Sequence, residues 1–163
     1  VRNYSEVGKG TTMCLYFPRF TGSIDIVEPS GDVIGVEEGH GETVVVIDDD
    51  DGVRALMVEV LQDAGYAVIE AQDGPSGLEI LRSERRVDLL ITDVGLPGGL
   101  NGRQVADAAR VVRPDLGILF ITGYAENAAV GNGLLDPGME VITKPFAVQA
   151  LCTKVRDMLD RRP

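Results

Sequence analysis

A β-branched apolar run that ends in a row of acids constrains this chain more than any other feature. Residues 43–47 read Thr-Val-Val-Val-Ile, and residues 48–51 are all aspartate. A run of this kind predicts a strand that is buried on both faces, as in a parallel sheet. Open α/β sheets place their sites in the crevice beyond the carboxyl ends of the strands. The four acids therefore predict a functional site at the end of this strand.

Three further apolar runs are each followed by a residue with a charged or hydroxyl side chain. Residues 87–92 lead to Asp93, residues 116–121 to Thr122, and residues 140–143 to Lys144. If these runs fold as neighbouring parallel strands, three carboxylates, a hydroxyl and an ammonium converge at one edge of the sheet. Carboxylates this close repel each other unless a cation joins them, and oxygen ligands of this type suit Mg²⁺ together with phosphate oxygens. The pattern predicts a phosphoryl-transfer site on Asp93.

From residue 43 onward, strand patterns alternate with helix patterns. We expect strands at 43–48, 66–70, 87–92, 116–121 and 140–143, and helices at 52–64, 74–84, 102–112, 124–134 and 147–160. Gly65 indicates the end of the first helix, and Asp51 is the expected cap at its start. Five strand–helix units predict an α/β fold, with a doubly wound parallel sheet covered on both faces.

These motifs carry a resemblance that spans residues 43–160. The chain resembles a response-regulator receiver domain in four segments: Val-Val-Val-Ile-Asp48-Asp49-Asp50, Thr92-Asp93-Val-Gly-Leu-Pro97, Thr122-Gly-Tyr-Ala125 and Thr143-Lys144-Pro145-Phe146. The resemblance implies a flavodoxin-like (βα)5 fold with the strand order 2-1-3-4-5. It also implies that Asp93 accepts a phosphoryl group from phosphohistidine. In this scheme Thr122 and Lys144 contact the phosphoryl oxygens, and Mg²⁺ is held by Asp48, Asp49, Asp93 and the Gly95 carbonyl.

The sequence departs from the family pattern in two places. The loop after Asp93 is one residue longer than the family pattern leads us to expect. Val141 stands three residues before Lys144, where the family usually carries a switch aromatic. The switch candidates are therefore Thr122, Tyr124 and Val141, with Tyr124 divided between ordinary packing and shielding of the phosphoryl site. Because Val141 cannot act as a flipping aromatic, we expect any switch to move a loop and a helix instead.

The first nineteen residues suggest a second domain. Met13, Leu15 and Phe17 alternate, which predicts a strand at 12–17 preceded by a glycine-rich loop. This stretch resembles the last glycine box and final strand of a sensor histidine kinase ATP-binding domain. We therefore divide the chain into a kinase remnant at 1–19, a linker at 20–42 and a receiver at 43–163. The resemblance implies the tail of a hybrid histidine kinase, in which this fragment is a phosphoacceptor and not itself a kinase.

Composition narrows the range of partners and compartments. The 163 residues carry a net charge of −11, which argues against direct binding to nucleic acid. Cys14 and Cys152 lie far apart, so we expect no disulfide and a cytoplasmic setting. No apolar run is long enough to span a bilayer. The expected partners are a histidine kinase or a histidine phosphotransfer domain, with output through protein contacts.

Two other functions remain open at the level of sequence. The first is a Mg²⁺-dependent phosphatase with an aspartyl nucleophile, which would need an acid two residues after Asp93. That position is Gly95. The second is a receiver that works only as an unphosphorylated docking surface, for which the complete set of Asp93, Thr122 and Lys144 would be unnecessary. His40, the only histidine, lies in the linker, where a solvated residue is expected.

Overall fold

The computed structural model describes residues 2–14, 16, 39–123 and 135–161 of the chain. These residues belong to two compact units, Val1–Asp32 and Val33–Pro163.

The N-terminal unit contains a two-stranded antiparallel hairpin. Strand β1 (Arg2–Glu6) pairs along its whole length with strand β2 (Gly10–Cys14). The turn between them is closed by the Lys9 N–H, which donates to the Glu6 carbonyl at 2.9 Å. Gly8 and Gly10 both have positive φ, at 81° and 100°, which glycine adopts without steric cost.

This hairpin corrects the expected strand at 12–17. The strand spans Gly10–Cys14, so it begins two residues earlier than expected, and its backbone is paired with β1. The alternation of apolar residues pointed to a strand, but it could not show that the glycine turn brings residues 2–6 back alongside. Met13 is exposed; Leu15 and Phe17 lie outside the described residues.

The C-terminal unit is built on a five-stranded parallel sheet. Its strands are β3 (Thr43–Ile47), β4 (Ala67–Ala71), β5 (Leu89–Asp93), β6 (Gly117–Thr122) and β7 (Met139–Thr143). Their order across the sheet is β4-β3-β5-β6-β7. Counted within this unit, that order is 2-1-3-4-5, which confirms the predicted topology.

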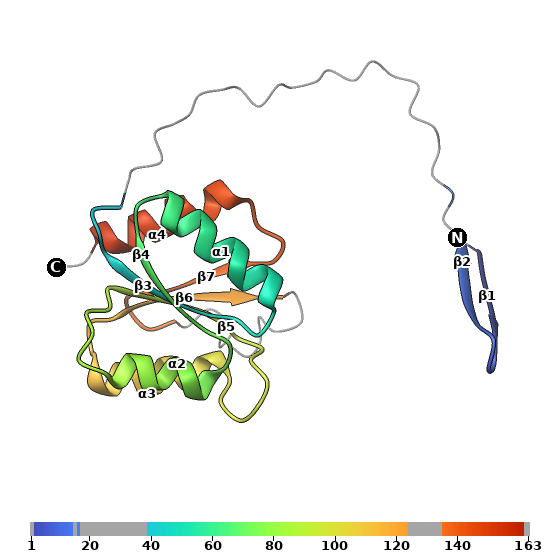
Figure 1. The fold of residues 1–163 in the computed structure, drawn as a ribbon, viewed down its shortest axis with the longest axis horizontal. Coiled ribbons are helices and arrows are strands. Elements are labelled where there is room, and N and C mark those ends of the chain that lie inside the picture. Colours follow the sequence, from blue (N-terminus) through green and yellow to red (C-terminus); the bar gives the residue numbers. More distant parts are fainter. Residues whose placement is uncertain (1, 15, 17–38, 124–134, 162–163) are drawn as a thin grey trace, which may run out of the picture. The chain divides into compact units, whose positions relative to one another are not determined.

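Helices cover both faces of this sheet. Helices α1 (Asp51–Asp63) and α4 (Val148–Asp160) lie on one face, and α2 (Gly74–Arg82) and α3 (Gly102–Val112) lie on the other (Figure 1). The helix expected at 124–134 lies outside the described residues. The other four expected helices are present, with their ends shifted by no more than two residues.

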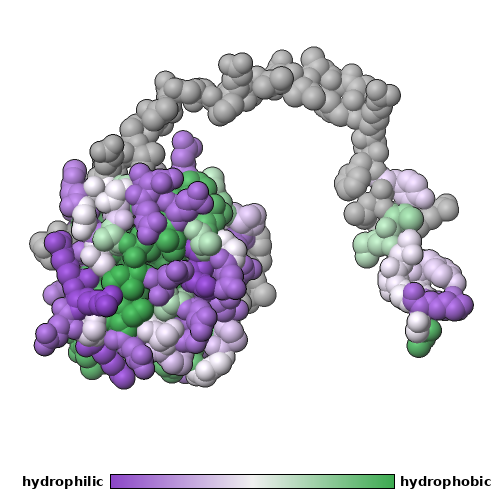
Figure 2. Space-filling view, viewed as in Figure 1, coloured by the Kyte–Doolittle hydropathy of each residue, from purple (hydrophilic) through white to green (hydrophobic). Residues whose placement is uncertain are grey.

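Burial on both faces explains the continuous apolar strands. In β3, Val45 and Ile47 pack on the side of α2 and α3, whereas Val44 and Val46 pack on the side of α1 and α4. All four side chains are fully buried. Hydrophilic residues cover most of the face of this unit that Figure 2 shows, around a hydrophobic strip between the two helical layers.

The start of α1 differs from the prediction by one residue. Asp50, not Asp51, is the cap: one of its carboxylate oxygens accepts from the Gly52 N–H at 2.8 Å and from the Val53 N–H at 3.0 Å. Asp50 has extended backbone geometry, which a cap requires, and Asp51 is already helical. A row of aspartates cannot show which member adopts that backbone. At the other end, Gly65 has a positive φ of 86° and follows the helix, as predicted.

Residues 39–42, placed in the linker from sequence, belong to the larger unit and contact other parts of it. The Gly39 N–H donates to the Ala64 carbonyl at 2.6 Å, and a Cβ atom at position 39 would lie 2.7 Å from the Tyr66 ring. Glu42 forms an ion pair with Arg156 on α4, with 2.9 Å between Oε1 and Nη1. His40 is exposed, and its backbone N–H donates to Glu42.

These contacts predict where the C-terminal unit can be cut. A chain that starts at Gly39 should unfold in urea with the same free energy as the full chain. A chain that starts at Thr43 should lose about 2 kcal/mol, because Arg156 loses a largely buried carboxylate partner. Equal stability of the two shortened chains would show that residues 39–42 contribute nothing to this unit.

Candidate functional site

The register of the sheet aligns the predicted residues at one edge. Ile47 pairs with Thr92, Asp93 with Ile121, and Thr122 with Thr143. Asp48 therefore follows its strand next to Asp93, and Lys144 follows its strand next to Thr122. The backbone N–H of Lys144 also donates to the Thr122 carbonyl at 2.8 Å. All four residues lie at the carboxyl ends of the strands, as the sequence predicted.

Three carboxylates form a compact cluster at this edge. Asp48, Asp49 and Asp93 each offer one carboxylate oxygen, and these oxygens lie within 4.8 Å of one another. Asp48 is fully buried, Asp93 is mostly buried and Asp49 is exposed. A cluster with one exposed member and several hard oxygen donors fits a divalent cation that remains accessible to a further ligand.

Lys144 joins two of these acids. Its Nζ atom lies 2.8 Å from Asp93 Oδ2 and 3.0 Å from Asp48 Oδ2. Burial disfavours the charged ammonium, but the hydrogen bonds to Asp93 and Asp48 outweigh it and raise the pKa of Lys144. Lys144 is therefore a cation at neutral pH. One ammonium faces three carboxylates, which leaves an excess of negative charge at the cluster.

Burial is the largest influence on the pKa of Asp48. Desolvation raises the pKa of its carboxyl group, and the Asp50 N–H and Lys144 offset this effect only in part. The Asp50 N–H donates to Asp48 Oδ1 at 2.9 Å, so both carboxylate oxygens of Asp48 have a donor. An additional cation at this cluster would favour the ionised form further.

Close neighbours hold both the carboxylate and the backbone carbonyl of Asp93. The Gly95 N–H donates to Asp93 Oδ1 at 3.1 Å, and the Thr92 hydroxyl donates to the Asp93 carbonyl at 3.0 Å. Gly102, the first residue of α3, approaches so closely that a Cβ atom there would lie 2.0 Å from the Asp93 carbonyl oxygen. The absence of a side chain at Gly102 is therefore a condition for the position of Asp93.

The predicted switch residues have different surroundings. Thr122 is fully buried, and its hydroxyl donates to the Gly123 carbonyl at 2.9 Å. Val141 is partly buried and pairs with Phe120 in the register of β6 and β7. Tyr124 lies outside the described residues. The roles of all three in switching stay predictions.

Two residues at this edge were not predicted to belong to the site, although Gly102 was expected to begin a helix. Arg54 on α1 donates through Nη1 to the Asp48 carbonyl at 2.8 Å, and Gly102 makes the close approach described above. The three-residue spacing of Asp51 and Arg54 indicates an ion pair on a helix, but nothing in the sequence points from Arg54 to the strand end.

A comparison with known families decides the identity of this unit. The family model for the response regulator receiver domain matches residues 44–156. The chain belongs to the response regulator receiver family. Receiver domains act in two-component signalling, interact with histidine kinases or phosphotransfer proteins, and bind Mg²⁺ at an acidic pocket; some regulators of the family also bind DNA. The predicted fold and the predicted receiver function are thereby confirmed.

Individual relatives support this assignment. The sensor kinase CckA of Brucella abortus is 34% identical over 97% of this chain, which spans only 17% of CckA. The receiver protein CpdR of the same organism is 34% identical over 71% of this chain and 95% of CpdR. The solved structure of TrrA from Thermotoga maritima, a complex with Mg²⁺ and BeF, is similar with 29% identity and a TM-score of 0.62, covering 72% of this chain and 98% of TrrA.

Two further properties bear on the receiver's environment. Within the described residues, no helix combines the length and apolar character that a membrane span needs. Cys14 is exposed on β2 and Cys152 is buried on α4, and both are free thiols.

Proposed function

We propose that this receiver accepts a phosphoryl group on Asp93 from a phosphohistidine, with Mg²⁺ as the cofactor. The observation that carries the proposal is the contact of Lys144 with both Asp93 and Asp48 inside a cluster of three carboxylates. An ammonium and a carboxylate nucleophile are thereby held together at the open edge of a rigid sheet. This is the combination that phosphoryl transfer to an acid requires.

The residues of the chain divide the chemistry between them. A carboxylate oxygen of Asp93 attacks phosphorus, the new O–P bond forms, and the N–P bond of the phosphohistidine breaks. The bonding electrons leave with the imidazole. Lys144 lies close enough to Asp93 to stabilise negative charge on the phosphoryl oxygens as the group arrives. The product is an acyl phosphate on Asp93.

Thr122 would take part only after a change of partner. Its hydroxyl proton is engaged by the Gly123 carbonyl. To donate to a phosphoryl oxygen, the hydroxyl has to release that carbonyl. This exchange would link the arrival of the phosphoryl group to the backbone at Gly123, immediately after β6, and it supports Thr122 as the residue that senses phosphorylation.

The ligand set for the metal follows from the cluster. Asp48, Asp49 and Asp93, with the Gly95 carbonyl, would hold Mg²⁺. When bound, the ion neutralises the excess negative charge of the carboxylates and of the phosphoryl oxygens. Gly95 occupies the position at which an aspartyl phosphatase needs an acid, so the chain offers no carboxylate there to activate water. An acyl phosphate that persists long enough to signal is the expected result.

The parent protein is proposed to be a hybrid sensor histidine kinase in the cytoplasm. The similarity to CckA extends over 97% of the chain and therefore reaches beyond the receiver into the N-terminal unit. The β1–β2 hairpin would be the remnant of an ATP-binding domain at residues 1–19, joined by a linker at 20–42 to the receiver at 43–163. The net charge of −11 favours output through protein contacts rather than nucleic acid.

Metal dependence tests the proposed site. Mg²⁺ at about 100 times its dissociation constant should stabilise the fold by about 2.7 kcal/mol and raise the melting temperature by roughly 5–10 °C, and chelator should reverse both effects. Asp49→Asn should remove the response without lowering the melting temperature in chelator, because it relieves repulsion within the cluster. Asp63→Asn, at the far end of α1, serves as the control and should respond like the wild type.

The same samples test the phosphoryl chemistry. Incubation with acetyl phosphate should add one phosphoryl group, detected by intact mass, only when Mg²⁺ is present. An equal melting temperature with Mg²⁺ and with chelator, or labelling that continues in excess chelator, would contradict the proposal.

A further inference from the structure

Arg54 connects three segments around the strand end that carries Asp48. Its guanidinium donates to the Asp48 backbone carbonyl through Nη1 at 2.8 Å, to Asp51 Oδ1 through Nη2 at 2.6 Å, and to Glu70 Oε2 through Nε at 3.0 Å. The three contacts reach the end of β3, the first turn of α1 and the edge strand β4. The planar fork of an arginine can make them simultaneously, and a lysine cannot.

We infer that Arg54 is a positioning residue for the acidic cluster. It holds the main chain of the 48–50 turn so that the carboxylates of Asp48 and Asp49 stay beside Asp93. The inference rests on the proposed function, because the purpose of that placement is to bind Mg²⁺ next to the phosphoacceptor.

The contact with the Asp48 carbonyl is the strongest of the three. The Arg54 side chain is 13% exposed, but its acidic partners Asp51 and Glu70 are 89% and 57% exposed. Exposed ion pairs contribute about 0–1 kcal/mol. The cationic hydrogen bond to a carbonyl beside buried Asp48 is far less screened by solvent.

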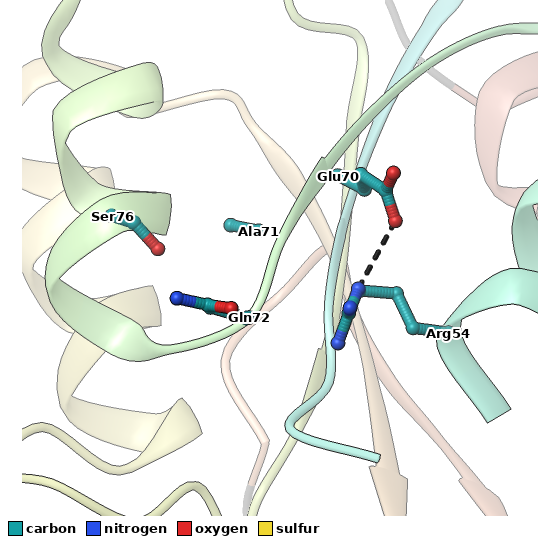
Figure 3. Close-up of a pocket in the computed structure, with 5 residues that line it drawn as sticks. All are labelled: Arg54, Glu70, Ala71, Gln72 and Ser76. Atoms are coloured by element: carbon teal, nitrogen blue, oxygen red, sulfur yellow. Dashed lines mark hydrogen bonds and ion pairs between the residues drawn. The ribbon is translucent and has the colours of Figure 1, made fainter. Parts of the chain in front are cut away.

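An open cavity explains why Glu70 contributes little. A cavity of about 320 Å³ lies beside the Arg54–Glu70 pair, with Arg54 and Glu70 on one side and Ser76 on the other (Figure 3). The Glu70 side chain is more than half exposed at this open cavity, so solvent screens its ion pair with Arg54. The cavity also leaves space beside residue 54 for a lysine side chain in place of the arginine.

Asp49 is the ligand that most needs this support. Asp48 has donors on both carboxylate oxygens and Asp93 is held by Gly95 and Lys144. In the part of the chain that the structure describes, the Asp49 carboxylate makes no hydrogen bond or ion pair. Its position therefore depends on the backbone of the turn between Ile47 and Asp51, which Arg54 holds at Asp48.

A charge effect and a positioning role predict opposite changes in Mg²⁺ affinity when Arg54 is replaced. A guanidinium near the cluster repels Mg²⁺, so loss of the charge alone would strengthen metal binding. Loss of positioning would weaken it, and residues that orient metal ligands typically contribute about 10–100-fold in affinity. The sign of the change thus separates a positioning role from a charge effect.

The experiment measures Mg²⁺ affinity by titration calorimetry and unfolding by urea in chelator, for the wild type, Arg54→Met, Arg54→Lys and Glu70→Gln. We expect the two Arg54 variants to bind Mg²⁺ at least about tenfold more weakly than the wild type. Glu70→Gln removes an ion pair but keeps the carbonyl contact, so its affinity should equal that of the wild type. A purely structural role would lower stability in chelator for all three variants and leave the affinities alike.

Several outcomes would overturn the inference. Wild-type affinity in Arg54→Lys would refute it, as would tighter binding in Arg54→Met or a loss in Glu70→Gln as large as in Arg54→Lys. If Arg54→Met does not fold, Arg54→Lys decides, because it preserves the charge and most of the side-chain volume. A wild-type chain that binds no Mg²⁺ would refute the proposed function as well, whereas Mg²⁺ binding that is insensitive to Arg54 refutes the positioning role alone.

Discussion

Replacement of Asp93 by Asn should abolish phosphoryl labelling by acetyl phosphate in saturating Mg²⁺. The carboxamide has nearly the same shape as the carboxylate, but it is not a nucleophile toward phosphorus. The amide oxygen can accept the hydrogen bond that Lys144 now donates to Oδ2, and the NH2 group then replaces Oδ1, the acceptor of the Gly95 N–H. The variant loses that one exposed hydrogen bond, which costs about 1 kcal/mol. The folded structure should therefore persist, and the loss should lie in the chemistry. Intact mass spectrometry measures the fraction of labelled chains.

The matched control for this variant is Asp50→Asn. Asp50 belongs to the same run of acids but caps α1, a role that Asn fills equally well. Its labelling should equal that of the wild type. Labelling of Asp93→Asn at a wild-type level would assign the phosphoryl group to another residue. A melting curve of each variant establishes that both are folded when they are labelled.

Replacement of Gly102 by Ala should disrupt the site without touching a functional side chain. The new Cβ atom would lie 2.0 Å from the Asp93 carbonyl oxygen and 3.0 Å from the Thr92 hydroxyl oxygen. Either α3 or the end of β5 must move, and such overpacking typically costs about 1–3 kcal/mol and sometimes more. We expect a loss of about 3 kcal/mol in urea unfolding, together with weaker Mg²⁺ binding and slower labelling.

Helix propensity alone predicts the opposite change in stability for Gly102→Ala. Ala is favoured over Gly in a helix by about 1 kcal/mol, so propensity alone predicts a gain for Gly102→Ala. The control is Arg103→Ala, at the next position of α3, where the side chain forms partly exposed ion pairs and the change should stay within about 0.5 kcal/mol. Wild-type stability and labelling of Gly102→Ala would show that the contact with Asp93 relaxes without consequence.

The sequence by itself determined the architecture and the membership of the site. A parallel strand with helices on both faces buries both of its surfaces, so β3 appears in the sequence as an uninterrupted β-branched run. The strand ends follow from these runs, and parallel strands bring their carboxyl ends to one edge. For this reason Asp48, Asp93, Thr122 and Lys144 could be grouped before their distances were known.

Tertiary structure alone decided how that site is held. The contact of Arg54 with the Asp48 carbonyl and the approach of Gly102 to Asp93 each join segments through backbone atoms. The backbone is chemically the same at every residue, so such contacts leave no periodic or compositional signal. The choice of Asp50 over Asp51 as the cap is of the same kind, because it depends on backbone angles within a run of identical side chains. The sequence shows the chemistry of each side chain, whereas close approaches to the main chain form only when the chain folds.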